Sequence, residues 1–348
     1  MVTRVPEYFE QFRCLAGDCP DTCCGQWAIV VDDAAKARYL SVDGPLGDRI
    51  RHALTEQDGE TCMVLKNGHC PLLTKDGLCS VVLEKGEEFL STTCHTHPRF
   101  TEIYGNLSET MLSVSCPEAA RLLMTQETPL QFLTTVNEQP PEPTDLDPQL
   151  FSLVLESRQL AMALVQDRSR PLSDRLALLL VFARRLDRRL RRPKAARRLL
   201  QAFADSDLQD RILKGLRHAH EEPAYPGFLR TLMEDMEHLS PDFPSLLSSL
   251  GAVSLRSVGL EQLTVYYLFR WWLKAGCDGY LWRQAAACVV SILTVSALSH
   301  SVGSELEAAR LYSKEVEHSE DNLILLRRRM DRISLRRLLR CLEGSHAI

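Results

Sequence analysis

Cysteines crowd the first third of this chain and constrain its fold more than any other feature of the sequence. Nine of the twelve lie between Cys14 and Cys116. Eight of them form two groups, Cys14-x4-Cys19-x3-Cys23-Cys24 and Cys62-x7-Cys70-x8-Cys79 with Cys94. They stand among Gly, Pro and Asp residues, which form the tight turns that ligand loops need. Since four thiolates complete a zinc or an iron–sulfur site, these eight cysteines predict one or two metal sites.

The adjacent pair, Cys23 and Cys24, bears on the kind of metal. Neighbouring side chains point apart in extended backbone, so they suit a polynuclear cluster or two sites better than one zinc ion. Cys116 precedes a predicted helix that has Pro117 at its first position. A metal ligand and a core residue are equal alternatives there.

The N-terminal segment and the apolar runs argue against export and membrane insertion. MVTRVPEYFEQFRC carries acids and lacks the apolar region of a signal peptide. No run of about 18 apolar residues predicts a membrane span, and Ala285 to Leu298 is expected to be a buried helix. We therefore expect a cytoplasmic protein with reduced thiols, in which dense cysteines serve metal binding or redox chemistry.

The sequence divides into three zones within a mainly α fold. Residues 1–125 form a small, irregular, cysteine-rich metal-binding domain in this prediction. Residues 126–149 are a Pro-rich linker, because VNEQPPEPTDLDPQ contains four prolines and several acids. Residues 150–348 follow helical periodicity and predict an α-helical domain of about eight helices.

Local signals place the predicted helices of this last zone. Ser173-Asp174 caps a helix that continues to about Leu190, and Pro193 breaks it and opens the next one. Further helical stretches are expected near 207–219, 226–238, 260–275, 280–301, 304–317 and 320–342.

Two arginine-rich runs stand out in the helical zone. Arg184 to Arg198 holds eight arginines and one lysine against one Asp, and Arg327 to Arg340 is similar. They are either solvated faces of amphipathic helices or surfaces for an acidic partner or anionic lipid, which would allow peripheral membrane association. The formal net charge of -5 and the flanking acids argue against nucleic acid.

Five segments together resemble a known family. They are CLAGDCPDTCCGQWAI, NGHCPLLTKDGLCSV, TTCHTHPRF, LSVSCPEAARLL and, near the C-terminus, YSKEVEHSEDNLILL. The first four resemble zinc- or iron-chelating cysteine-cluster domains. With the fifth, the chain looks most like flagellin lysine-N-methylases.

This resemblance implies an enzyme that transfers methyl groups from S-adenosylmethionine to lysine ε-amines of flagellin. It also implies a [4Fe-4S] cluster held by the cysteines, with zinc as the alternative. One segment departs from the family: related proteins often have Cys-Arg-x-Tyr-Pro-Arg where this chain has Cys94-His95-Thr96-His97-Pro98-Arg99. No familiar methyl-donor motif is visible, so the donor site stays unassigned.

Several other residues are candidates for the site. Arg99 would neutralise a cluster or a donor carboxylate, or it is a plain surface arginine. His95 and His97 are metal ligands or supporting groups. Glu317 and His318 are the catalytic candidates, since a carboxylate or an imidazole can deprotonate and orient a lysine substrate. The aromatic segment Tyr266 to Trp272 is a core stripe or a cage for a lysine ammonium.

Two hypotheses of other classes stay open beside the methylase. One is a non-catalytic zinc- or iron-binding module for structure or metal handling, and the other is a redox-sensing interaction protein. A homo-oligomer is compatible with either one and with the enzyme.

Overall fold

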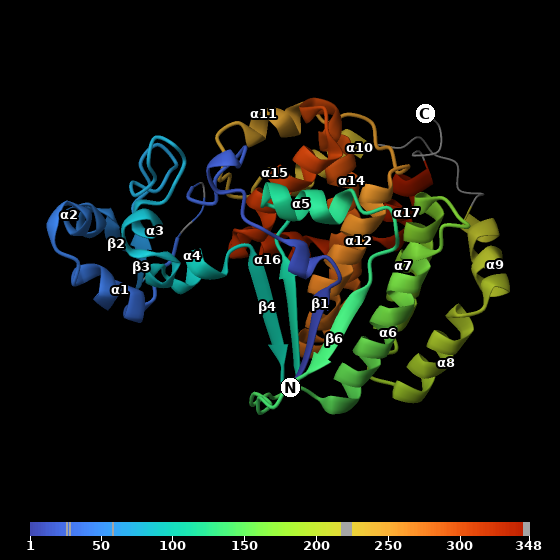
Figure 1. Ribbon diagram of the computed structural model, residues 1–348. Helices are drawn as coiled ribbons and strands as arrows, with labels where there is room; N and C mark the ends of the chain where they lie inside the picture. Colours follow the sequence, from blue (N-terminus) through green and yellow to red (C-terminus); the bar gives the residue numbers. More distant parts are fainter. Residues whose placement is uncertain (26, 28, 58, 217–224, 344–348) are drawn as a thin grey trace.

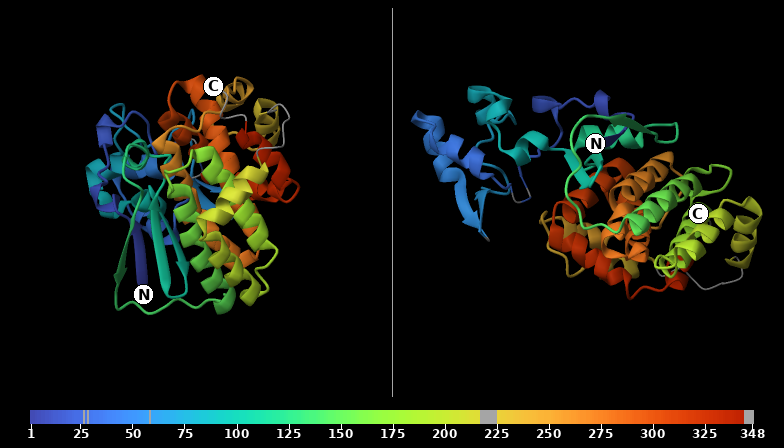
Figure 2. Two further views of the ribbon diagram at one scale, coloured as in Figure 1. Left: turned by 90° about the vertical axis from the view of Figure 1, so that its right-hand side faces the viewer. Right: turned by 90° about the horizontal axis from the view of Figure 1, so that it is seen from below.

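The computed structural model describes the whole chain except residues 26, 28, 58, 217–224 and 344–348. Helices hold 58% of the residues and strands 11%, which confirms the mainly α prediction. A large helical body carries a small sheet on one side, and a lobe of short elements stands off from it (Figure 1). The view from below shows this lobe beside the body rather than over it (Figure 2).

The body contains more helices than the eight predicted. Among the described residues they are α6 (Pro148–Gln166), α7 (Leu172–Asp187), α8 (Pro193–Phe203), α9 (Ser206–Leu216), α10 (Tyr225–Met233), α11 (Phe243–Ser248), α12 (Val258–Trp271), α13 (Ala275–Asp278), α14 (Leu281–Val302), α15 (Glu305–Glu317), α16 (Glu320–Met330) and α17 (Leu335–Glu343). Pro193 opens α8 as predicted. The stretch 320–342 is two helices rather than one, because Ser334 accepts a hydrogen bond from Arg337 N and starts a new helix.

A four-stranded sheet joins the N-terminal residues to this body. Its strands are β1 (Val2–Pro6), β4 (Arg99–Tyr104), β5 (Leu107–Leu112) and β6 (Phe132–Val136), in the order β4-β5-β1-β6. β4 and β5 form a hairpin around Gly105, whose φ of 62° favours glycine. β1 runs parallel to β5 and antiparallel to β6. β6 lies inside the range 126–149, which the sequence predicts to be linker.

Two separate hydrophobic cores underlie the two parts. The larger core combines sheet residues such as Leu112 with α5 (Pro117–Met124) and the body helices. The smaller core, from Ile29 to Val81, holds together the cysteine lobe, by which we mean residues 29–97. The predicted domain boundaries therefore stay a prediction, while the cores show that β1, the β4–β5 hairpin and α5 pack with the helical body.

The cysteine lobe is built from short pieces, as its turn-rich sequence predicts. They are α1 (Asp33–Leu40), α2 (Gly44–Ala53), β2 (Leu54–Gln57), β3 (Glu60–Met63), α3 (Ser80–Lys85) and α4 (Thr92–Thr96). Asp32 caps α1 through Ala35 N and also accepts a hydrogen bond from Thr92 N. One carboxylate thus fixes both the first and the last helix of the lobe.

Helix α14 lies largely buried within the body. It is long and apolar enough to cross a membrane by length and composition, but most of it is enclosed by the other helices. The expectation of a buried helix over Ala285 to Leu298 is thereby confirmed.

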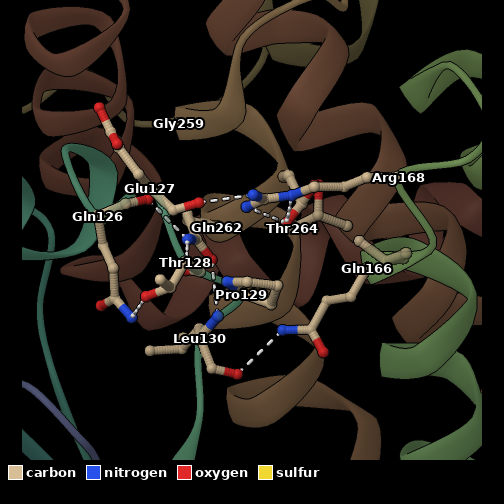
Figure 3. A network of polar contacts seen from close by, with 12 residues as sticks. Gln126, Glu127, Thr128, Pro129, Leu130, Gln166, Arg168, Gly259, Gln262 and Thr264 are labelled. Atoms are coloured by element: carbon tan, nitrogen blue, oxygen red, sulfur yellow. Dashed lines mark hydrogen bonds and ion pairs between the residues drawn. The ribbon is translucent and has the colours of Figure 1, made fainter.

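A polar network fastens the segment between α5 and β6 to the helices (Figure 3). The fully buried amide of Gln262 donates to the carbonyl oxygens of Gln126 and Thr128 and accepts from Leu130 N. Gln166 donates to the carbonyl oxygen of Leu130. Because these backbone groups are satisfied by side chains, the segment lies against the body without regular structure.

Candidate functional site

The first cysteine group lies in a loop between the sheet and the cysteine lobe. Burial raises the pKa of the Cys19 thiol, and the neighbouring thiols of Cys14 and Cys23 raise it further. Burial also raises the pKa of Cys116 to about 11, with contributions from Cys19 and Cys14. Since only groups close in space influence one another in this way, Cys116 joins the first cysteine group.

The second group meets the first at Cys23. Burial raises the pKa of Cys70 to about 11, and the thiols of Cys94, Cys79 and Cys23 add to the effect. The pKa of Cys94 is also raised to about 11 by burial, with contributions from Cys79 and Cys23. Cys70 N donates a 2.7 Å hydrogen bond to the carbonyl oxygen of Cys24. Segments that are about fifty residues apart in the sequence therefore place their thiols together.

A close backbone approach makes this meeting possible. Gly25 forms a bridge with His69, and a Cβ on Gly25 would overlap the carbonyl oxygen of Gly68. Only glycine fits there, because any side chain would push the two cysteine segments apart.

Cys62 has a different setting from the other seven predicted ligands. It lies buried in β3, opposite Thr55 in β2 and in a bridge with Val30. Its role as a ligand stays a prediction.

The donor chemistry of the grouped thiols fits an iron–sulfur cluster or zinc, both of which prefer thiolates. Among the described residues, no three His, Cys, Asp or Glu side chains have an arrangement that holds a metal ion as they stand. The ligand set, the metal and the nuclearity therefore remain predictions.

Helix α15 faces the first cysteine loop. Arg310 and Lys314 both donate to the same carboxylate oxygen of Asp21, which lies between Cys19 and Cys23 in the sequence. Burial, followed by repulsion from Arg310, lowers the pKa of Lys314 to about 8. Burial beside a second cation therefore lowers the pKa of this ammonium group relative to one in water.

Rings from three of the resemblance segments gather at the C-terminal end of α15. The ring of His318 lies 4.9 Å from that of Trp27, 5.9 Å from that of His97 and 5.7 Å from that of Phe100, measured between centroids. His318 Nε2 lies 2.7 Å from the hydroxyl oxygen of Ser115. Burial, followed by the charges of His97, Arg270 and Lys314, lowers the pKa of His318 to about 3, so this imidazole is neutral at physiological pH.

The other catalytic candidate, Glu317, is enclosed by partners. Its carboxylate pairs with Arg270 and accepts hydrogen bonds from Tyr266 at 3.1 Å and from Ser313 at 2.8 Å. Arg270 in turn lies 4.0 Å over the ring of Phe100. A carboxylate so fully engaged orients its neighbours, and its catalytic role stays a prediction.

The remaining candidates lie in different places. Arg99 starts β4 exposed to solvent, with its guanidinium 5.8 Å and 5.5 Å from the ring centroids of Phe9 and Phe12. His95 is exposed on α4. The aromatic residues Tyr266, Tyr267, Trp271 and Trp272 are all buried in the body, which favours the core alternative over a cage.

Sequence reasoning singled out neither Asp21, Trp27 nor Ser115. Each owes its importance to a contact across about 200 residues or more of sequence. No local spacing signals such contacts, although all three residues lie inside the segments that carry the resemblance.

The match to a family model falls in the helical body. Residues 158–257 match the FliB lysine N-methylase C-terminal domain. This confirms the resemblance to flagellin lysine-N-methylases and supports a methyltransferase that acts on lysine. The matched segment begins within α6 and ends at the residue before α12. It contributes Gln166 and Arg168 to the polar network of Figure 3, where they donate hydrogen bonds to the carbonyl oxygens of Leu130 and Glu127. Searches among curated proteins and among solved structures gave no match.

Proposed function

We propose that this chain transfers methyl groups from S-adenosylmethionine to lysine ε-amines of flagellin in the cytoplasm. The lysine nitrogen attacks the methyl carbon, the carbon–sulfur bond of the donor breaks, and S-adenosylhomocysteine leaves. The ammonium proton must be lost before the attack, since only the neutral amine has a free electron pair. The match to the FliB lysine N-methylase domain supports the reaction class. The geometry around α15 supports the location of the reaction beside this helix.

One observation carries the proposed location. All five segments of the resemblance converge between the first cysteine loop and the C-terminal half of α15. Asp21 and Trp27 come from the first segment, His97 from the third and Ser115 from the fourth, while Lys314 and His318 come from the fifth. The second segment reaches the same place through the thiols of Cys70 and Cys79 beside Cys23.

The surroundings of α15 favour deprotonation of an incoming lysine. Arg270, Arg310 and Lys314 are cations, and the imidazoles of His97 and His318 are neutral. Burial next to these cations lowers the pKa of an ammonium, as it does for Lys314 itself. The hydrogen-bonded pair of His318 Nε2 and the Ser115 hydroxyl would then orient the neutral amine for attack, while the proton leaves to water.

We further propose that the grouped thiols hold a [4Fe-4S] cluster. Cys23, Cys70, Cys79 and Cys94 are the proposed ligands, because the pKa values of Cys70 and Cys94 are both raised in part by the thiols of Cys79 and Cys23. Such a cluster would supply a charged group whose state depends on oxygen and reductant. The remaining thiols of the first loop, Cys14, Cys19 and Cys24, are alternative ligands.

A non-catalytic metal module is the second candidate function. It is favoured by the packing of Cys24, Cys70, Cys79 and Cys94 against the small core of the lobe, which a structural metal would stabilise. The two candidates differ in one assay. Protein purified anaerobically is incubated with isotopically labelled S-adenosylmethionine and flagellin, and lysine methylation is measured by mass spectrometry. Methylated flagellin supports the enzyme, whereas metal-dependent folding without methyl transfer supports the module.

A further inference from the structure

The ion pair between the first cysteine loop and α15 is more than a surface contact. Arg310 and Lys314 stand one turn apart on α15 and converge on one carboxylate oxygen of Asp21. The side chains of Asp21, Arg310 and Lys314 are only 20%, 9% and 12% exposed. The residues on the two sides of the contact are separated by 289 and 293 positions in the sequence.

Stability alone is a weak reason for this arrangement. Burying two cations side by side costs free energy, and a single carboxylate offsets only part of it. Glu307 supplies a second carboxylate to Arg310 through bonds of 2.8 Å and 2.6 Å. Two carboxylates therefore face the two cations, one from the loop and one from α15, so part of the compensating charge depends on the loop being in place.

The position of Asp21 lets its ion pairs fix the backbone of the first cysteine loop. Asp21 lies two residues from Cys19 and two from Cys23, and its Oδ1 accepts a 2.7 Å hydrogen bond from Thr22 N. Fixing the carboxylate therefore fixes the backbone that carries both thiols. On the other side, Lys314 lies one helical turn before His318.

A second connection runs from the same loop to the same imidazole. Trp27 Nε1 donates a 2.9 Å hydrogen bond to the carbonyl oxygen of Cys23. The ring of Trp27 then packs 4.9 Å from that of His318. The loop thus meets α15 at two points, and Cys23 lies between them.

We propose that Asp21 is a positioning residue for methyl transfer. Its pairing with Arg310 and Lys314 seats the first cysteine loop on α15, so that a change at the thiols moves Trp27 relative to His318. This inference rests on the proposed function for its effect on catalysis, but the seating of the loop has a readout of its own.

The test compares full-length Asp21→Asn with the wild-type protein, both purified anaerobically. Hydrogen exchange over residues 14–27 and the rate at which iodoacetamide alkylates Cys19 and Cys23 report the seating of the loop. Removing the carboxylate takes away the charge that ties the loop to Arg310 and Lys314, and we expect alkylation to become ~10-fold faster. We expect kcat to fall while KM for flagellin changes little, because the loop orients the site rather than binding the protein substrate.

Three further variants make the result decisive. Asp331→Asn is the matched control, because it removes a carboxylate from an ion pair with Arg283 that is outside the site. Asp21→Glu retains the charge and should restore slow exchange. Lys314→Gln, which leaves Arg310 to hold the loop, tests the contact if Asp21→Asn does not fold.

The outcomes separate this inference from the proposed function. Unchanged exchange and alkylation in Asp21→Asn would overturn it, as would an equal change in Asp331→Asn. If the wild-type protein methylates nothing, the proposed function fails, while exchange and alkylation still report whether Asp21 seats the loop.

Discussion

His318 Nε2 lies 2.7 Å from the hydroxyl oxygen of Ser115, although 203 residues separate the two in sequence. Ser115 comes directly before Cys116 and α5, and His318 ends α15, so this contact joins the cysteine-rich segments to the C-terminal motif. We predict that His318→Gln lowers the rate of lysine methylation by about 100-fold, because the substrate amine loses a group that orients it for attack. His52→Gln, at an exposed histidine in α2, is the control. Equal rates in both variants would exclude a role for His318 in the reaction.

Two half-buried imidazoles predict how stability depends on pH. Burial is the main cause that lowers the pKa of His97 to about 4 and that of His318 to about 3. An unfolded histidine titrates near pH 6.5. Below that pH the unfolded chain binds protons that the folded chain does not, so this contribution to stability is complete above pH 6.5 and is lost as the pH falls towards 4.

Chemical denaturation at a series of pH values measures this effect. The free energy of unfolding should decrease between pH 6.5 and 4 in the wild-type protein, and less steeply in His97→Gln/His318→Gln. His52→Gln should retain the wild-type slope. Parallel curves for the double variant and the wild type would show that these imidazoles do not titrate as we infer.

The grouped thiols predict which substitutions remove the metal. Cys23→Ser should lose most of the bound iron and sulfide, because Cys23 lies beside both cysteine groups. Cys277→Ser is the control, since Cys277 is exposed in α13, outside both cysteine groups. Metal analysis and absorption spectra of anaerobic protein provide the measurement. Bound zinc in place of iron would exclude the cluster, and metal retained in Cys23→Ser would exclude this ligand.

The buried pair between Arg158 and Glu109 predicts a large loss of stability. Both side chains are 3% exposed, and Arg158 also donates to the carbonyl oxygen of Phe269. Arg158→Met leaves the carboxylate buried with Arg4 as its remaining ion-pair partner among the described residues, so we expect a cost of about 3–5 kcal/mol in the free energy of unfolding. Arg283→Met, at a more exposed pair with Asp331, should cost less than about 1 kcal/mol. Urea denaturation distinguishes these values, and similar costs would contradict the account.

The two arginine-rich runs meet at one end of the body. Asp187 in the first run accepts a hydrogen bond from Trp282 N, and Trp282 Nε1 donates to the carbonyl oxygen of Met330 in the second. If this end contacts anionic lipid, the protein should sediment with vesicles that contain phosphatidylglycerol and not with phosphatidylcholine alone, and salt should weaken the binding. Arg188→Glu/Arg191→Glu should reduce sedimentation, with Arg211→Glu/Lys214→Glu on α9 as the control. If the protein does not bind vesicles, or if both variants bind equally, the arginine-rich runs are solvated helix faces and not a lipid-binding surface.

Several features with a local signal were predicted from the sequence, although Ser173-Asp174 lies in the first turn of α7 and the N-cap is Pro171. Pro193 at a first helical position marks the start of α8, and the apolar stretch at Ala285 to Leu298 marks the buried part of α14. Each of these follows from steric or periodic rules that act over a few residues.

Contacts between distant segments could not be predicted in this way. β1 pairs with β5 about a hundred residues later, and Asp21 pairs with α15 nearly three hundred residues later. These partners are chosen by tertiary packing, and no period or spacing within either segment records the choice. Cys116 shows the same limit, since its local sequence allowed a ligand and a core residue equally and only the fold places it beside Cys14 and Cys19.

The central claim is that this chain methylates lysine and does so beside α15. Its most direct test is a single-turnover assay with anaerobic protein, labelled S-adenosylmethionine and flagellin, comparing the wild type with His318→Gln and His52→Gln. The account predicts labelled methyl-lysine in flagellin with wild-type protein and with His52→Gln, and about 100-fold slower labelling with His318→Gln. No label in flagellin with metal-loaded wild-type protein would contradict the activity, and full labelling by His318→Gln would contradict the site.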